Sequence, residues 1–230
     1  MMLLLAQVES QPFFRWDWVF RNLDDIWDRT VEHVMLTLIA VTVGFVISLG
    51  LSLVAIRWRR AYSPITWATG IMYTIPSLAL FAFLLPITGL SVLTAEIGLV
   101  SYTLLILIRN IVAGVDGVPP DVLESATGMG YTARRRFLEI ELPLALPVII
   151  AGIRIASVTV IGLVTVTALI GFGGYGFFIL RGLGLFYSSI GTTQIIVGTV
   201  LSVTLAVSVD LGLAATERAL TPWARKKVPA

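Results

Sequence analysis

The stretch that decides the fold is ESATGMGYTARRRFLEIELP, residues 124–143, a charged and glycine-containing segment of a strongly apolar chain. Two apolar segments flank it: residues 97–115, interrupted only by Arg109, and residues 143–170, interrupted only by Arg154. A helix that crosses a membrane needs about 20 mostly apolar residues, and both segments are near or above that length. We therefore expect residues 124–143 to form a polar loop between two membrane-spanning helices.

The composition places the whole chain among membrane proteins. Of its 230 residues, 57% are hydrophobic and 13% are charged, and the mean hydropathy is +0.93. A soluble domain carries about 25% charged residues. A net charge of +2 does not indicate a nucleic-acid partner, and the chain has no cysteine and a single histidine, His33, so no metal site is expected. The apolar start lacks a basic region, so a cleaved signal peptide is not predicted.

Apolar segments predict five membrane-spanning helices and an all-α fold. They cover residues 34–56, 61–95, 97–115, 143–170 and 192–215. Inside a bilayer the backbone must satisfy its own hydrogen bonds, so all five are read as helices. The second segment is ambiguous, because Pro76 and a turn signal at residues 86–91 allow one long helix or two short ones.

Three basic clusters, at residues 57–60, 134–136 and 225–227, predict the orientation. The positive-inside rule places all three in the cytoplasm, which requires residues 61–95 to cross the membrane once. The N-terminus is then outside, and the C-terminus lies in the cytoplasm beneath a plasma membrane. This divides the chain into an extracytoplasmic interfacial segment (1–32), a transmembrane domain (33–218) and a basic cytoplasmic tail (219–230).

The N-terminal segment carries Trp16, Trp18, Phe20 and Trp27 among its charges. These residues can form a short helix that lies in the outer interface with its aromatic side chains toward lipid. They can also form an aromatic belt that anchors the first span, which is the preferred interpretation. Membrane lipid is the expected neighbour in both cases.

The loop at residues 119–142 has the signals of a short helix, a turn and a second helix. Pro119 and Pro120 can open a helix, because the first turn does not use the N–H groups that proline lacks. Gly128 and Gly130 permit a turn with positive φ. Thr132 can cap a second helix that runs through the arginines. Such a unit could dock in a groove of a partner, whereas an ordinary loop would only fix the topology.

The spacing within this loop resembles the "EAA" loop of binding-protein-dependent ABC importer permeases. In that family Glu-Ala-Ala is followed after three residues by Gly, and after nine more by Ile-x-Leu-Pro. Residues 124–143 meet every spacing and depart only at Ser125, where the family has Ala. The resemblance implies that the loop contacts an ATPase subunit. The residues it assigns to this coupling are Glu124, Ser125, Ala126, Gly128, Gly130, Arg134, Arg135, Leu142 and Pro143.

Further stretches resemble the osmoprotectant subfamily, which takes up glycine betaine, choline, carnitine and related solutes. They are YTIPSLAL (73–80), RN (109–110), ELPLALP (141–147), AGIR (151–154) and GFGGYG (171–176). In the last of these, Phe172 and Tyr175 replace smaller or aliphatic residues of the subfamily. The resemblance implies the type I permease fold with five spans. Methionine permeases share much of the pattern, so an importer of methionine or another amino acid stays an alternative.

Two segments are candidates for the transport pathway. Pro76 removes a backbone hydrogen bond in mid-helix, and a broken helix at the membrane midplane is one way to build a transport site. The expected pathway residues are Tyr73, Thr74, Pro76 and Ser77, with Thr74 and Ser77 as candidates to compensate the break. A purely structural kink is equally compatible. A turn at the outer mouth is expected at Gly171, Gly173, Gly174 and Gly176.

Three charged residues interrupt the predicted spans: Arg109, Arg154 and Asp210. Ionisable residues inside spans usually face the bundle and pair with one another. We therefore expect Asp210 to pair with Arg154, or else with Arg109. In the alternative, these charges line the pathway and select the solute.

The chain has no G-x-x-x-x-G-K-[ST] phosphate loop. It is therefore not expected to be an enzyme or to hold a cofactor, and ATP and Mg would bind to a partner ATPase. The resemblance implies two ATPase subunits, a second permease that is identical or paralogous, and an extracytoplasmic solute-binding protein. A secondary transporter driven by an ion gradient and a membrane scaffold without transport are the alternatives from other classes.

Overall fold

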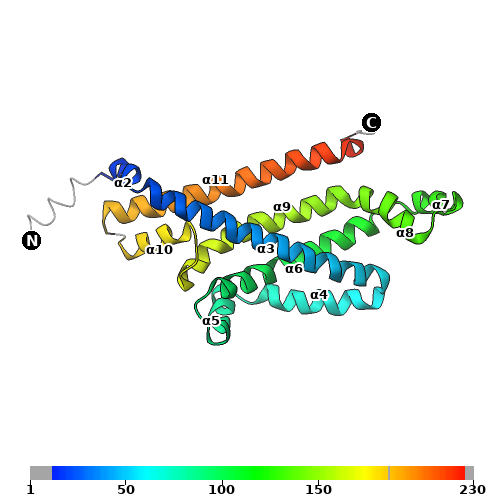
Figure 1. Cartoon of the computed structure of the whole chain (residues 1–230), viewed down its shortest axis with the longest axis horizontal. Helices are drawn as coiled ribbons and strands as arrows, with labels where there is room; N and C mark the ends of the chain where they lie inside the picture. The colour runs from blue at the N-terminus through cyan, green and yellow to red at the C-terminus, as the bar shows by residue number, and fades with distance from the viewer. Residues whose placement is uncertain (1–11, 186, 226–230) are drawn as a thin grey trace, which may run out of the picture.

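A computed structural model describes residues 12–185 and 187–225 of the chain, and every regular element in these ranges is helical. Four long helices run along the long axis of the molecule (Figure 1): α3 (Leu23–Arg57), α6 (Val92–Asp116), α9 (Leu142–Val166) and α11 (Ser189–Leu220). All four are long and apolar enough to cross a membrane. They correspond to the first, third, fourth and fifth spans expected from the sequence.

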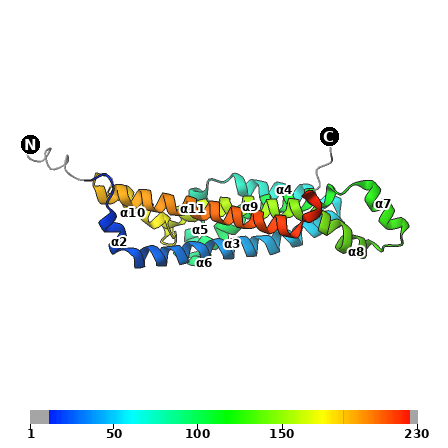
Figure 2. The same ribbon diagram turned by 90° about the horizontal axis from the view of Figure 1, so that it is seen from above.

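Short helices lie at both ends of this bundle (Figures 1 and 2). At one end α7 (Pro120–Gly128) and α8 (Ala133–Arg136) extend beyond the long helices, and the last described residues lie at the same end. At the other end are α2 (Trp16–Arg21) and α10 (Gly176–Gly184). The connection between α3 and α4 lies at the α7 end, where Arg59 at the start of α4 forms a two-point ion pair with Asp116 at 2.6 and 2.7 Å. Residues 57–60 and 134–136 therefore gather at one end, where Arg225 of the third basic cluster also lies; residues 226 and 227 of that cluster are outside the described residues.

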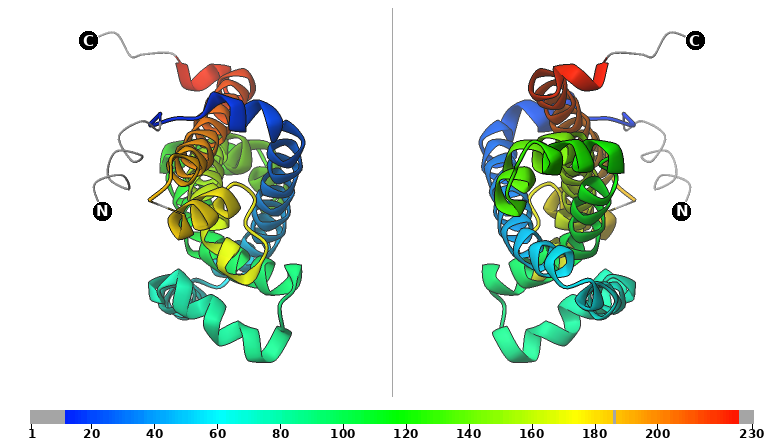
Figure 3. Two further views of the ribbon diagram at one scale, coloured as in Figure 1. Left: turned by 90° about the vertical axis from the view of Figure 1, so that its left-hand side faces the viewer. Right: turned by 90° about the vertical axis from the view of Figure 1, so that its right-hand side faces the viewer.

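The second expected span is broken. α4 (Arg59–Thr74) and α5 (Ser77–Thr88) meet at 96°, and they can count as one bent span. Ile75 and Pro76 are both extended, with ψ of 127° and 133°, because a residue before proline avoids the helical region. The end views show α4 and α5 outside the ring of long helices (Figure 3). Residues 92–95, which we assigned to this span, begin α6 instead.

The first span is longer than its uncharged core. α3 has 35 residues, about 52 Å at 1.5 Å per residue, whereas the hydrocarbon core of a bilayer is about 30 Å thick. The boundary drawn at residues 32 and 33 therefore falls inside a continuous helix. Within α2, Trp16 and Phe20 are exposed, but Trp18 is buried against Phe178 of α10 with ring centroids 5.8 Å apart. One aromatic residue thus docks on the bundle while its neighbours face outward.

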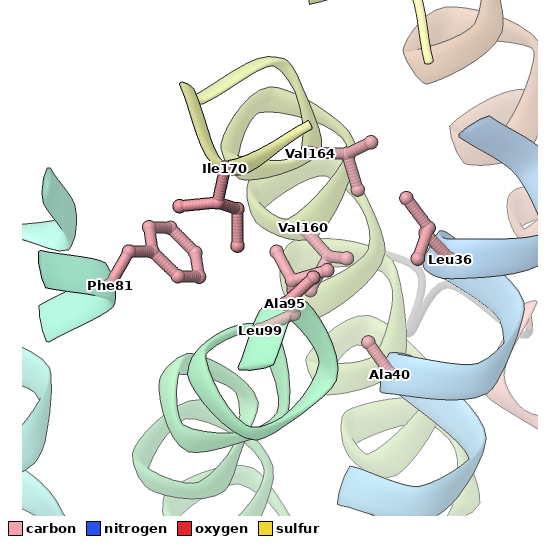
Figure 4. Close-up of a cluster of buried hydrophobic side chains, with 8 residues drawn as sticks. All are labelled: Leu36, Ala40, Phe81, Ala95, Leu99, Val160, Val164 and Ile170. Carbon is pink, nitrogen blue, oxygen red and sulfur yellow. The ribbon is translucent and has the colours of Figure 1, made fainter. Parts of the chain in front are cut away.

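The core lies where α3, α6 and α9 meet. Its largest cluster contains Leu36 and Ala40 of α3, Ala95 and Leu99 of α6, and Val160 of α9, with further buried residues from α5, α9 and the turn after it (Figure 4). α3 and α6 approach so closely at Gly44 that a Cβ there would overlap the side chain of Thr103. Small residues are thus required for the two helices to pack.

Candidate functional site

Helix α7 carries the first half of the expected coupling motif. Pro119 is extended and Pro120 occupies the first turn, as the paired prolines predicted. Ala126 is completely buried, whereas Glu124 and Ser125 are exposed. The hydroxyl of Ser125 donates to the carbonyl of Asp121 at 2.8 Å, so serine is accommodated on the helix in place of the family's alanine.

The turn after α7 depends on Gly130 rather than on both expected glycines. Gly130 has a φ of +82°, a conformation that residues with a Cβ rarely adopt. Gly128 closes the helix and has no positive φ, so that expectation was wrong for Gly128. Thr132 then caps α8 by accepting a hydrogen bond from the Arg135 backbone N–H at 3.3 Å, as predicted.

The three arginines after the turn have different roles. Arg136 connects the two halves of the loop, because it donates to Glu141 at 2.8 Å and to Thr127 of α7 at 3.2 Å. Arg135 pairs with Glu139 at 3.0 Å on the exposed side of its helix. Arg134 is exposed and forms no ion pair with another residue of the described ranges. It is free to contact a partner.

The loop joins the bundle through a continuous helical run rather than a break. Residues 137–141 form a π-helical turn in which the Leu142 N–H donates to the Phe137 carbonyl. Pro143 has no N–H to donate, so the regular hydrogen-bond ladder is interrupted at this point. Helical structure nevertheless extends from Ala133 to Ile170. The second half of the loop is thus connected to α9 without an intervening non-helical segment.

A shallow groove of about 340 Å³ lies between α7 and Arg136. Leu123, Glu124, Thr127 and Gly128 line it together with Arg136. Glu124 forms no hydrogen bond or ion pair with another described residue, so its carboxylate is available at the rim. This end of the molecule thus presents a short helix with two acids, Asp121 and Glu124, that pair with no other described side chain. A groove lies between this helix and Arg136, and the unpaired Arg134 lies on the next helix.

The break at Pro76 is compensated by a residue that the sequence did not suggest. The hydroxyl of Tyr102 on α6 donates to the carbonyl of Ile75, and its ring contacts that of Tyr73 with centroids 5.8 Å apart. Thr74 bonds only within its own helix, to Ile71 at 2.8 Å. The compensation expected from Thr74 and Ser77 is therefore wrong, because a neighbouring helix supplies the donor.

The glycine-rich turn has the positive φ angles and close backbone contacts that its glycines predict, but most of it is buried and does not line an open entrance. Gly171 and Gly174 have φ of +91° and +48°, and a Cβ on Gly173 or Gly176 would overlap the backbone of η2 (Thr167–Ile170) or of Thr165. All four glycines are therefore needed, yet the last three are buried.

His33 of α3 holds this turn in place. Its Nδ1 accepts from the Tyr175 N–H at 3.3 Å, so Nε2 carries the proton and donates to the Ile161 carbonyl at 3.1 Å. The Tyr175 ring lies 4.8 Å from the imidazole and its hydroxyl donates to Thr30. This structural role of His33 was not predicted, because a lone histidine in a sequence gives no indication of its partners.

Two of the three charged residues expected within the spans, Arg154 and Asp210, form a cluster with Glu217. Arg154 of α9 contacts Asp210 of α11 through two hydrogen bonds of 2.8 and 2.9 Å, and the expected pair is thus confirmed. A third bond of 3.2 Å joins Arg154 to Glu217, which lies beyond residues 192–215, the apolar segment of the last expected span. Arg109 is exposed and has no ion pair with a described residue.

This cluster borders an open groove of about 650 Å³ between α9 and α11. The side chains of Arg154 and Asp210 are 29% and 35% exposed. Charged groups at this depth do not face lipid, because a charge in the hydrocarbon region is costly. The groove must therefore face protein or water in the assembled membrane protein.

Sequence comparison connects this geometry with known proteins. Residues 40–222 match the family described as "binding-protein-dependent transport system inner membrane component". The choline transport system permease of Bacillus subtilis is 38% identical over 202 residues, which are 87% of this chain and 91% of that protein. The glycine betaine/carnitine/choline permease of the same organism is 36% identical over the same shares. The osmoprotectant import permease of Salmonella typhimurium is 34% identical over 84% of this chain and 90% of its own.

The fold has a counterpart among solved structures. The inward-facing MetNI methionine ABC transporter has a chain that matches with a TM-score of 0.73 at 22% identity, covering 90% of this chain and 100% of that one. At this identity the likeness concerns the fold alone, which is that of a type I importer permease. The family match covers most of the chain and includes the whole EAA-type loop. The chain therefore belongs to the binding-protein-dependent transport system inner membrane components, the permeases of ABC importers.

Proposed function

We propose that this chain is the transmembrane permease subunit of an ATP-driven importer for compatible solutes such as glycine betaine, choline or carnitine. The observation that carries the proposal is the loop of α7 and α8, which extends from the bundle with Glu124 and Arg134 unpaired among the described residues. The solute class rests on the relatives, which are named for these solutes. The methionine transporter shares the fold only, so methionine is the weaker alternative.

The permease supplies no chemistry in this proposal. ATP and Mg are held by two ATPase subunits that grip the α7–α8 loops of two permease chains from the cytoplasmic side. A solute-binding protein delivers the solute at the end bearing α2 and α10. This orientation is supported by the arginine clusters, which gather at the α7 end as the positive-inside rule requires of a cytoplasmic face.

The pathway is proposed to run along the faces of the bundle that a second permease chain would close. The groove beside Arg154 and Asp210 has the size of a small-solute site and carries charges that cannot face lipid. The elbow at Pro76 leaves Tyr73 and Thr74 exposed, and it projects from the bundle beside α5. Both faces are incomplete in the single chain.

Reconstitution tests the function. The chain is placed in lipid vesicles with its ATPase and its binding protein, and ATP hydrolysis is measured with glycine betaine, choline, carnitine or methionine. Stimulation of hydrolysis by one of the first three solutes is expected, and stimulation by methionine alone would overturn the solute class. Glu124→Lys should abolish the stimulation without removing the chain from the membrane, because it reverses the charge at the proposed contact.

A further inference from the structure

Glu96 is a buried acid that the proposed transport function does not use. It lies one turn inside α6 and is 9% exposed, and neither of its carboxylate oxygens has a hydrogen-bond partner among the described residues. Its neighbour Ala95 is completely buried in the apolar cluster of Figure 4. An ionised carboxylate without a partner in such surroundings is strongly unfavourable, so this position needs a neutralising ligand.

Thr37 of α3 is placed to meet Glu96. α3 and α6 run in the same direction and touch at Gly44 and Thr103. Thr37 and Glu96 each precede that contact by seven residues, about two helical turns, which puts them on about the same helix faces as the contacting pair and at a similar level. Thr37 is also buried, at 8% exposed, and its hydroxyl oxygen has no partner among the described residues. Two unsatisfied polar groups thus lie at a similar level of two packed helices, where Thr37 also borders a groove formed with α9 and α11.

No cation is available to pair with Glu96 from the helices that pack on α6. α5 has no titratable side chain, and the single one of α9, Arg154, is held by Asp210 and Glu217. On α4, Tyr73 contacts Tyr102. The remaining charges of α4 lie at its other end, beyond Tyr62.

The titratable groups of α3 near this level are also engaged. His33 of α3 uses both ring nitrogens, for Ile161 and for the Tyr175 N–H, and is therefore neutral. Arg29, one turn further out on α3, pairs with Asp25 and Glu32. A proton is the ligand that neutralises Glu96 without another residue.

We propose that Glu96 and Thr37 form a proton-binding site between α3 and α6. The carboxylate of Glu96 takes up one proton from the aqueous phase, and the resulting carboxylic O–H donates to the Thr37 hydroxyl oxygen. Both unsatisfied groups are then paired and no net charge is buried. Release of the proton regenerates the carboxylate, which requires water between the helices. Proton binding therefore favours the packed arrangement of α3 and α6.

Infrared spectroscopy of the full chain in lipid vesicles tests the protonation directly, because a carboxylic acid has a C=O stretching band that a carboxylate lacks. At pH 7 the wild-type chain should show this band, and Glu96→Gln should lose it. Asp210→Asn is the matched control and should keep it, since Asp210 is ion-paired. Thr37→Val should shift the band, because the acid loses its acceptor.

Three outcomes would overturn the proposal. They are the lack of a carboxylic band in the wild type, a band that survives in Glu96→Gln, and a carboxylate band that shifts when sodium replaces potassium, which would indicate a metal cation instead. If Glu96→Gln fails to fold, Glu96→Asp serves in its place. This variant retains a carboxylic acid, so the C=O stretching band must remain but change its frequency.

A cysteine at Ala40 tests the consequence for packing, because Ala40 is completely buried in the core beside α6 and the chain has no other cysteine. Maleimide labelling of Ala40→Cys is followed against pH with Glu96 intact and in the Glu96→Gln background. We divide the labelling rate measured with Glu96 intact by the rate measured in the Glu96→Gln background. Above the pH at which the acid band disappears, this ratio should rise by up to about tenfold per pH unit, the limit for one proton. Equal rates at every pH would show that the proton does not hold the helices together.

Discussion

Replacing Asp210 by asparagine removes the main partner of Arg154 while leaving the size of the side chain unchanged. Breaking a fully buried ion pair by removing one partner costs about 3–5 kcal/mol. Here the two side chains are 29% and 35% exposed, and Arg154 keeps its bond to Glu217. We therefore expect Asp210→Asn to lower the free energy of unfolding by about 1–3 kcal/mol, since partial exposure reduces the penalty.

The assay is equilibrium unfolding of the purified chain in detergent, followed by helical circular dichroism. Glu217→Gln is the matched control, because it removes the charge from one bond of 3.2 Å rather than from two shorter ones, and it should cost about 0.5–1.5 kcal/mol. A double-mutant cycle of Asp210→Asn with Arg154→Met then isolates the coupling between the two residues.

A structural role for the ion pair is refuted if Asp210→Asn has the unfolding free energy of the wild type but transports the solutes with a different preference. That result would assign the charges to solute selection rather than to holding α9 against α11. A loss of stability together with unchanged preference is the outcome that the geometry predicts.

Three further predictions concern other parts of the chain. Gly130→Asp should uncouple ATP hydrolysis from uptake, because it places a Cβ at a φ of +82° at a cost of about 1–2 kcal/mol; a normal coupling ratio in transport assays would show that the turn is only a connector. Tyr102→Phe leaves the Ile75 carbonyl without its donor and should cost about 1–3 kcal/mol of unfolding free energy, with unchanged stability indicating that water replaces the hydroxyl. In a chain without native cysteines, Phe13→Cys and Ala133→Cys should react with an impermeant maleimide from opposite sides of the membrane, and labelling from one side would contradict the topology.

Local signals in the sequence predicted the loop well, because each depends on residues close together in the chain. Pro120 opens α7, Thr132 caps α8 and Gly130 supplies the positive φ, all through backbone restrictions that need no distant partner. The four long helices were likewise predictable, since uninterrupted apolar length decides them. The ends of these helices were less predictable, because a helix can continue through charged residues outside the hydrocarbon region, as it does at the start of α3.

Features that depend on contacts between helices were not predictable from one sequence. The donor for the Ile75 carbonyl is Tyr102, 27 positions away, and the partner of His33 is a turn 142 positions away. Glu217 lies outside the apolar core of the last span, so counting charges within spans missed its bond to Arg154. The burial of Glu96 depends on the packing of α3 against α6, which sequence spacing does not specify.

The most direct test of the central claim is uptake of radiolabelled solute into vesicles that contain the chain, its ATPase and its binding protein. The account predicts that the solute accumulates only when ATP is present on the side of the membrane where the ATPase is bound. Accumulation should be lost in Glu124→Lys, although the variant is still present in the membrane. Accumulation driven by an ion gradient without ATP, or undiminished uptake by Glu124→Lys, would contradict it.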